Sequence, residues 1–160
     1  AASHLNFGVE LLDGNVSELE KNARVNLEAA KVTKAVSALS LSLSFVVSGL
    51  EQIPGELWKD PYYDLTLELS ALKCEVLFCL GEFDDCLEVV KEIDSRARTV
   101  EDKAEALIAK IRILGNRYEL EPAIEAGLSL LEALGENFPP RPSQLRLMYS
   151  LLVTQQSLRG

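Results

Sequence analysis

The most informative segment of the chain reads Leu77-Phe78-Cys79-Leu80-Gly81-Glu82-Phe83-Asp84-Asp85-Cys86-Leu87-Glu88-Val89-Val90. Its apolar first half predicts a helix that ends at Gly81, and its second half predicts an amphipathic helix that opens at Phe83. Cys74 and Cys86 are small residues placed where the two helices would cross most closely. The segment therefore indicates a pair of helices joined by a short turn.

The same pattern recurs on both sides of this segment. A small residue stands near the middle of the first helix of a pair, at Ala30 and Cys74, and near the start of the second helix, at Ser42, Cys86 and Ala123. A bulky residue stands three positions before the latter, at Leu39, Phe83 and Leu120. The small residue of the second helix recurs after 44 and then 37 residues, which aligns Ser37 with Gly81. In the third pair Tyr118 takes this place if the alignment has no gap, and Gly115 lies three residues earlier. A recurring helix pair of this length indicates a helical repeat.

The expected architecture is all-α, an α-solenoid of antiparallel helix pairs. We expect the pairs at about residues 17–53, 61–98 and 100–135, with flanking helices at 2–12 and 143–158. Asp60-Pro61 is expected to open the second pair, with Asp60 as its N-cap, and Arg96 and Arg98 to end it. Ser17–Glu20 and Thr99–Asp102 match capping boxes at the starts of the other two pairs.

Residues 36–53 admit two interpretations. Leu39, Leu41, Leu43 and Phe45 alternate with serine, which is typical of a half-buried strand. Leu39, Leu43, Val46, Val47 and Leu50 form a stripe at helical spacing. We favour the helix, because a lone strand would leave its backbone groups without partners.

Composition excludes some classes of partner. The 160 residues carry a net charge of −9, and a chain this acidic repels a phosphate backbone, so nucleic acid is not an expected partner. No apolar run reaches the ~20 residues of a membrane-spanning helix. Three cysteines, an odd number, without a signal peptide favour a cytoplasmic location. The first residues read as the interior of something longer, so we expect one helical-repeat domain over 1–160 that is a fragment of a longer protein.

The repeat resembles the tetratricopeptide repeat. The second pair matches it best, with Cys74, Leu77, Gly81, Phe83, Cys86 and Val90 at the expected spacings. The first and third pairs depart from it, because Ser37 and Tyr118 stand where glycine is usual. The resemblance implies a degenerate tetratricopeptide-like superhelix, a scaffold for protein contacts.

A second resemblance covers most of the chain. It rests on His4-Leu5-Asn6, Leu27-Glu28-Ala29-Ala30-Lys31 with Lys34-Ala35, Asp102-Lys103-Ala104, and Ala123-Ile124-Glu125-Ala126-Gly127-Leu128, in this order. The chain is similar to the helical repeat arm that follows the ATPase module of large modular signalling proteins related to sensor histidine kinases. The resemblance implies an arm that relays or gates signals by contacts with neighbouring domains. The phosphate-binding motif of the ATPase module itself is absent from this sequence.

Residues that suggest chemistry also have structural explanations. Cys74, Cys79 and Cys86 do not have a usual zinc spacing, so we expect packing residues. His4 is a lone histidine without a catalytic constellation. Trp58, Tyr62 and Tyr63 are either a partner hot spot or, as we favour, a seal between repeats. We therefore expect no enzyme activity in this segment, and no cofactor or metal.

The repeat register predicts one candidate interaction surface. First helices line the inner face of such an array, which places Arg24, Lys31 and Lys34 beside Glu68, Glu75 and Phe78. A basic segment beside an acidic one would hold the acidic end of a peptide, although a solvated helix face explains the same residues. The expected function is a non-catalytic protein–protein scaffold that relays signals within a multidomain ATPase or kinase. The alternative is a free-standing adaptor that binds a peptide in its groove.

Overall fold

The computed structural model describes residues 16–136, and within that range the chain is helical without any strand. In chain order the helices are α2 (Val16–Ala35), α3 (Leu39–Glu51), α4 (Tyr63–Leu80), α5 (Phe83–Arg96), α6 (Val100–Asn116) and α7 (Leu120–Ala133). The all-α expectation is confirmed for this part of the chain. The flanking helices expected at 2–12 and 143–158 lie outside the described residues.

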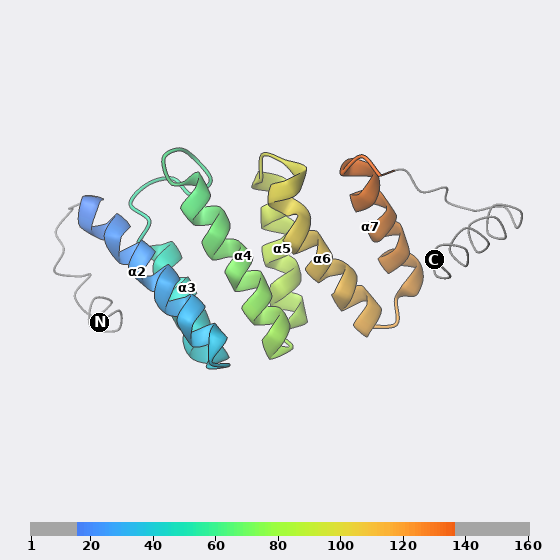
Figure 1. Cartoon of the computed structure of the whole chain (residues 1–160), viewed down its shortest axis with the longest axis horizontal. Coiled ribbons are helices and arrows are strands. Elements are labelled where there is room, and N and C mark those ends of the chain that lie inside the picture. The colour runs from blue at the N-terminus through green and yellow to red at the C-terminus, as the bar shows by residue number, and fades with distance from the viewer. Residues whose placement is uncertain (1–15, 137–160) are drawn as a thin grey trace, which may run out of the picture.

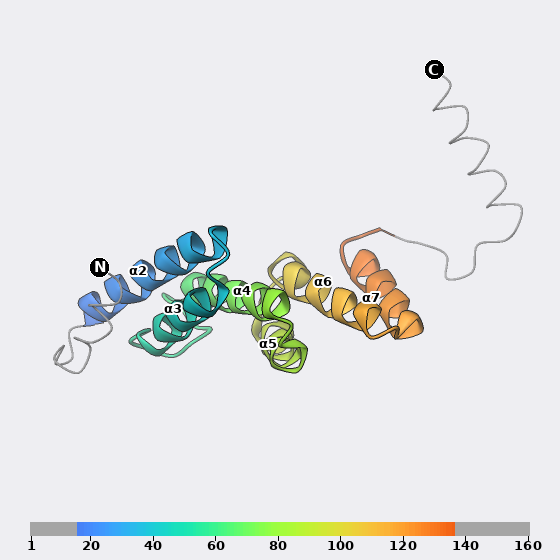
Figure 2. The same cartoon turned by 90° about the horizontal axis from the view of Figure 1, so that it is seen from below.

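The helices follow one another in a row, and each packs mainly against its neighbours in the sequence (Figure 1). Further contacts join α2 to α4 and α4 to α6. Figure 2 shows α2, α4 and α6 along one side of the row, and α3 and α5 along the other. The helices expected to come first in each pair therefore share one face.

The turns that end α2, α4 and α6 share one geometry. In each, a residue just beyond the helix has a left-handed φ, namely Ser37 (60°), Gly81 (81°) and Tyr118 (61°). The following amide donates back to a carbonyl oxygen in the last turn of the helix, from Ala38 to Thr33, from Glu82 to Leu77 and from Glu119 to Leu114, at 2.9, 3.0 and 2.9 Å. These are Schellman turns. The alignment of Ser37 and Tyr118 with Gly81 is thus confirmed, although neither is a glycine.

Small residues lie where paired helices cross, as the register predicts. Ser42 and Cys86 are fully buried, and each donates to a carbonyl oxygen of the preceding helix. Ser42 Oγ lies 2.8 Å from the oxygen of Ala30, and Cys86 Sγ lies 3.3 Å from that of Cys74. Ala123 is buried at the corresponding place in the third pair and has no side-chain donor. The first two pairs therefore share a hydrogen bond at the helix crossing that Ala123 cannot form.

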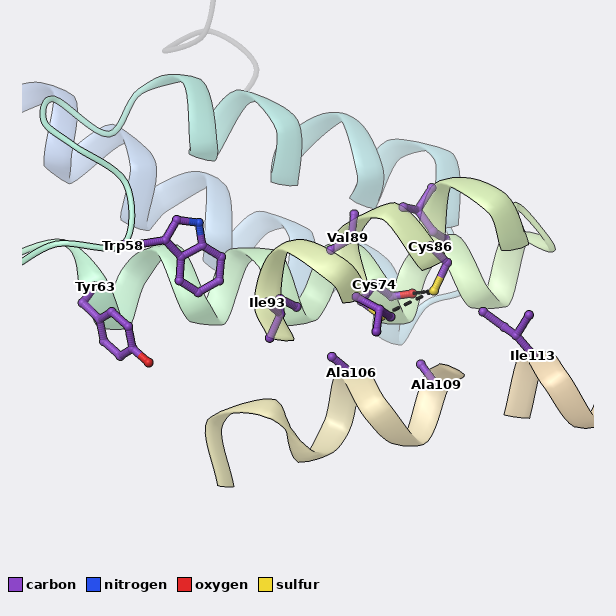
Figure 3. Packing of buried hydrophobic residues seen from close by; sticks show 11 residues of the cluster. Trp58, Tyr63, Cys74, Cys86, Val89, Ile93, Ala106, Ala109 and Ile113 are labelled. Atoms are coloured by element: carbon purple, nitrogen blue, oxygen red, sulfur yellow. Dashed lines mark hydrogen bonds between the residues drawn. The ribbon is translucent and has the colours of Figure 1, made fainter. Parts of the chain in front are cut away.

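The core divides into two clusters that meet in α4. The first joins α2 and α3 to the side of α4 that carries Leu65, Leu69, Leu72 and Val76. The second joins α4, α5 and α6, and its members include Trp58, Tyr63, Cys74, Ile93 and Ile113 (Figure 3). In the first cluster Gly49 lets α3 approach α4 closely, because an added Cβ would lie 2.9 Å from Leu69 Cδ2.

The stretch at 36–53 is helical, as we favoured. Within α3, Phe45 and Val46 are buried, and Leu43 and Leu50 pack against the first cluster. Leu41, which the strand interpretation places on the same face as Leu43, is exposed. The pattern of burial therefore follows the helical stripe.

The expected start of the second pair is wrong. The helix begins at Tyr63, and the Asp60-Pro61 peptide bond before it is cis. Tyr62 donates its amide to the carbonyl oxygen of Lys59 at 2.8 Å, so the chain turns around Pro61 before the helix begins. Asp60 is therefore not an N-cap.

Two other helix ends also differ from expectation. α5 ends at Arg96, because Ala97 is extended, and Arg98 lies beyond the helix. α2 already includes Val16, so Ser17 lies inside the helix and is not its N-cap. The capping box at the start of α6 is confirmed: Thr99 Oγ1 accepts from the amide of Asp102 at 3.1 Å, and Asp102 Oδ2 accepts from the amide of Thr99 at 3.3 Å.

Candidate interaction groove

A groove of about 370 Å³ is lined by residues of α2, α4 and α6. Of the residues that the sequence placed on this face, it brings together Lys31, Lys34, Glu68, Glu75 and Phe78. Between them the groove is lined by apolar side chains of α4 and α6, including Ala71, Leu72 and Ala109. The groove therefore combines an apolar floor with a charged rim.

The lysines of α2 already have acidic partners on α4. Lys31 Nζ lies 2.6 Å from Glu68 Oε1 and 2.9 Å from Glu28 Oε1, and Lys34 pairs with Glu75. The hydrogen bond to Glu68, followed by the one to Glu28, raises the pKa of Lys31 above its usual value. An acidic ligand at these lysines would have to displace the glutamates. The ion pairs thus tie α2 to α4 across the groove.

The α6 side of the groove has a different character. The Arg112 guanidinium lies 5.3 Å from the ring centroid of Phe78 and forms no ion pair with any residue between 16 and 136. Beside it, Ile108 exposes 41% of its surface. An apolar side chain next to a guanidinium without an acidic partner suits a ligand group that is apolar and ends in a carboxylate.

Arg24 does not line this groove. Its guanidinium donates to Glu20 within α2, at 3.0 Å, and 59% of the side chain is exposed. It is an ordinary surface ion pair one helical turn apart.

Sequence reasoning missed the residues that α6 contributes, namely Glu105, Ile108, Ala109 and Arg112. The signal was present in the repeat spacing. Adding the second interval of 37 residues to Glu68 and Glu75 gives Glu105 and Arg112. The register of the third pair therefore predicts the wall of the groove that α6 forms.

Two of the three cysteines, Cys74 and Cys86, are packing residues, and the expectation is wrong for Cys79. Cys74 and Cys86 are buried with their Sγ atoms 3.4 Å apart (Figure 3), and Cys79 is exposed. The hydrogen bond with Cys86, together with burial, raises the pKa of the Cys74 thiol well above its usual range. Between residues 16 and 136 no group of histidine, cysteine and carboxylate side chains is placed to hold a metal ion.

The aromatic trio seals joints between helices, as we favoured. Trp58 and Tyr63 are buried and pack edge to face with their ring centroids 6.2 Å apart. The Trp58 indole donates to Glu92 Oε1 at 2.9 Å. Tyr62 packs against the first core cluster. Trp58 and Tyr63 are thus covered by the fold, whereas Tyr62 is half-buried.

The Tyr63 hydroxyl fixes the link between α5 and α6. It donates to Asp102 Oδ2 at 2.6 Å and accepts from the amide of Arg98 at 2.7 Å. The Arg98 guanidinium covers the Tyr63 ring at 3.9 Å from the centroid and pairs with Asp60 at 3.0 Å. The hydrogen bond from Tyr63 holds the pKa of Asp102 below its usual value, and burial raises that of Tyr63.

The lone histidine, His4, lies outside the described residues. Of the helices between residues 16 and 136, none is long and apolar enough to cross a membrane. Comparison with known proteins finds no matching family model, no matching curated protein and no matching solved structure.

Proposed function

We propose that this chain is a tetratricopeptide-like α-solenoid of antiparallel helix pairs whose role is to bind protein. The repeated turns at Ser37, Gly81 and Tyr118 and the buried donors at Ser42 and Cys86 support a repeat of one helix pair. Arrays of such pairs present extended surfaces that bind partners without catalytic residues.

The groove on α2, α4 and α6 is the observation that carries the proposal. It is open to solvent and has an apolar floor with charged side chains at its edge. This is the chemistry of a site for a peptide or a protein segment, where apolar anchors give affinity and rim charges give orientation. Arg112, which has no acidic partner among residues 16–136, favours a partner with a carboxylate at this end of the groove.

A more specific proposal concerns whether the bound protein belongs to the same chain or is a separate peptide. The sequence resemblance to arms of signalling ATPases and histidine kinases supports a partner within the same long chain, so that the scaffold relays or gates signals in the cytoplasm. A free-standing adaptor that captures a peptide carboxylate is the second candidate, and Arg112 favours it. The full reading frame separates the two: a frame without an ATPase or kinase module would remove the relay.

Groove binding can be tested with peptides selected from a random library on the intact chain. We expect the selected peptides to lose at least about tenfold in affinity for Ile108→Asp and for Arg112→Glu, because both line the groove. Lys110→Glu is the matched control, since Lys110 is exposed on α6 outside the groove. Fluorescence polarisation measures the affinities. Equal binding by all three variants would remove the groove as the site.

The two lysines are poorer targets for this test. A glutamate at Lys31 or Lys34 would face Glu68 or Glu75 and push α4 away from α2, so lost binding would also report disturbed packing. Arg112 forms no ion pair with a described residue, so its reversal breaks no salt bridge between helices and removes only the contact of its guanidinium with the Phe78 ring.

A further inference from the structure

A second groove lies on the side of α6 that faces away from the first groove. Two adjoining hollows, of about 530 and 340 Å³, share Leu107, Lys110 and Leu114. Helical spacing places these residues opposite Glu105 and Arg112, which line the first groove. Residues of α5 and α7, which stand on either side of α6, form its walls (Figure 1). The two leucines are half-buried and give the second groove an apolar floor.

The rim of the second groove is mainly acidic. Seven charged side chains line it, of which five are acidic and two, Lys91 and Lys110, are basic. Asp85 and Glu125, on opposite walls, form no ion pair with any residue between 16 and 136. Residues 118–136, which include the α7 wall, contain no lysine or arginine. The second groove therefore suits a ligand that combines apolar surface with positive charge.

The equivalent positions one repeat earlier are covered. Leu77 and Val89 are buried in the second core cluster. Their counterparts 37 residues later, Leu114 and Ala126, are half-buried and line the second groove. The second pair thus covers positions that the third pair leaves open.

Trp58 contributes to this cover in the second pair. It belongs to the connection at 52–62 between α3 and α4, packs in the second core cluster, and donates to Glu92 Oε1 at 2.9 Å. The counterpart of Glu92 is Ser129, which lines the second groove. The connection between α5 and α6, at 97–99, is shorter and has no aromatic residue. An aromatic side chain that fills this joint in the same way has to come from elsewhere.

We propose that the second groove binds a basic segment of another protein through an aromatic side chain that takes the place Trp58 has one repeat earlier. The ring lies on Leu114 beside Ser129, and lysine or arginine residues of the bound segment face Asp85 and Glu125. A second copy of this chain is a poor match for this acidic rim, because the chain carries a net charge of −9. The proposal does not depend on the first groove, which lies on the opposite side of α6.

The chemistry of the ligand is tested by selecting peptides from a random library on the full chain that carries Ile108→Asp and Arg112→Glu. These two substitutions alter the first groove and leave the second unchanged. We expect the selected peptides to be enriched in an aromatic residue beside lysine or arginine. A selection that yields no such peptides would overturn the proposal.

Substitutions in the second groove then locate the bound peptide. We expect Glu125→Lys to weaken binding at least about tenfold by repelling the basic residues, and Ser129→Trp to do so by filling the hollow from within the chain. Glu105→Lys is the matched control, because it makes the same change of charge on the opposite side of α6, and it should alter the affinity less than about twofold. Fluorescence polarisation measures the affinities, and circular dichroism checks that each variant is folded.

Two results would place the binding elsewhere. Peptides that bind equally to Ser129→Trp and the unsubstituted side chain do not occupy the second groove, and an equal loss for Glu105→Lys and Glu125→Lys would report net charge alone. Sedimentation of the wild-type chain as a dimer that Glu125→Lys dissociates would assign the surface to a second copy. Each of these results overturns the proposal and leaves the test of the first groove unaffected.

Discussion

At the scale of single residues, the repeated turn geometry is held at two places by residues unsuited to it. Ser37 and Tyr118 adopt the left-handed conformation that Gly81 adopts at the equivalent position. For a residue with a Cβ this conformation costs roughly 1–2 kcal/mol. The hydrogen bonds of the turn and the packing of the paired helices hold both residues there.

Replacement by glycine should relieve this cost. We expect Ser37→Gly and Tyr118→Gly each to raise the free energy of unfolding by about 0.5–1 kcal/mol, after the greater freedom of glycine in the unfolded chain is counted. Urea denaturation measures the change. Gly81→Ala is the reverse control: a Cβ there would meet nothing within 4 Å, so any loss reports the backbone alone. Destabilisation by both glycine variants would contradict this reading.

Thr66 is a second residue whose surroundings in the folded protein cost stability. Its hydroxyl is fully buried and has no hydrogen-bond partner among the described residues. Thr66→Val keeps the shape and removes the hydroxyl, so we expect a gain of about 1 kcal/mol in the free energy of unfolding. Ser42→Ala provides the contrast, because it removes a hydroxyl that donates to Ala30 and should lose about as much. Equal signs for the two variants in urea denaturation would contradict the argument.

At the scale of elements, Tyr63 couples the start of α4 to the link between α5 and α6. We expect Tyr63→Phe to lower the free energy of unfolding by about 1–2 kcal/mol at neutral pH, since it leaves the amide of Arg98 without its partner. Trp58 fluorescence during urea denaturation reports the change. A variant as stable as the wild type would show that the hydroxyl contributes nothing net.

The same joint should respond to pH at both extremes. The folded-state pKa of Asp102 lies below its ordinary value of 3.8, so its contribution is present above that pH and is lost as pH falls through the folded pKa. The pKa of Tyr63 is raised above 10.0, so stability is lost as pH rises beyond that value. We expect Tyr63→Phe to flatten both limbs of a plot of stability against pH. An unchanged profile would assign the pH dependence to other groups.

The sequence predicted the elements that are governed by local pattern. The turns and the small residues at helix crossings follow from spacing, whereas the helix at α3 also needed the argument that a lone strand would leave its backbone groups without partners. The region around Asp60 could not be predicted in this way, because its partner Arg98 is 38 positions distant and is held by Tyr63. Arg98 looked like a helix end because its role depends on a tertiary contact that no local pattern records.

The residues of the candidate groove could likewise be predicted from spacing only in part. The register placed Lys31, Lys34, Glu68, Glu75 and Phe78 on one face, and the structure brings them together. Arg24 has the same register but pairs within its own helix, since a flexible side chain takes its nearest acidic partner. The ion pairs between α2 and α4 also depend on side-chain reach, which spacing does not specify.

At the scale of the whole molecule, α4 supplies buried residues to both core clusters. Helices α2 and α3 supply buried residues to the first cluster only, and α5 and α6 to the second only. Contacts run mainly between neighbours, with further ones from α4 to α2 and to α6, so the effect of a local perturbation should be greatest in the adjoining helices. We expect Leu69→Ala to accelerate hydrogen exchange mainly in α2 and α3, and Ile113→Ala mainly in α5 and α6, with α4 the slowest helix in the wild type. Each substitution should cost about 2–5 kcal/mol within its cluster. Uniform acceleration by either variant would instead indicate a single cooperative unit.

The one tryptophan of the chain gives this row of helices an optical reporter. Trp58 lies between α4 and α5, edge to face with Tyr63 and hydrogen-bonded to Glu92, so the wavelength and intensity of its emission depend on how tightly that joint is closed. Any ligand or neighbouring domain that bends the row at its centre alters this environment. The emission of the unlabelled protein can therefore be used to follow bending during binding, without an added dye.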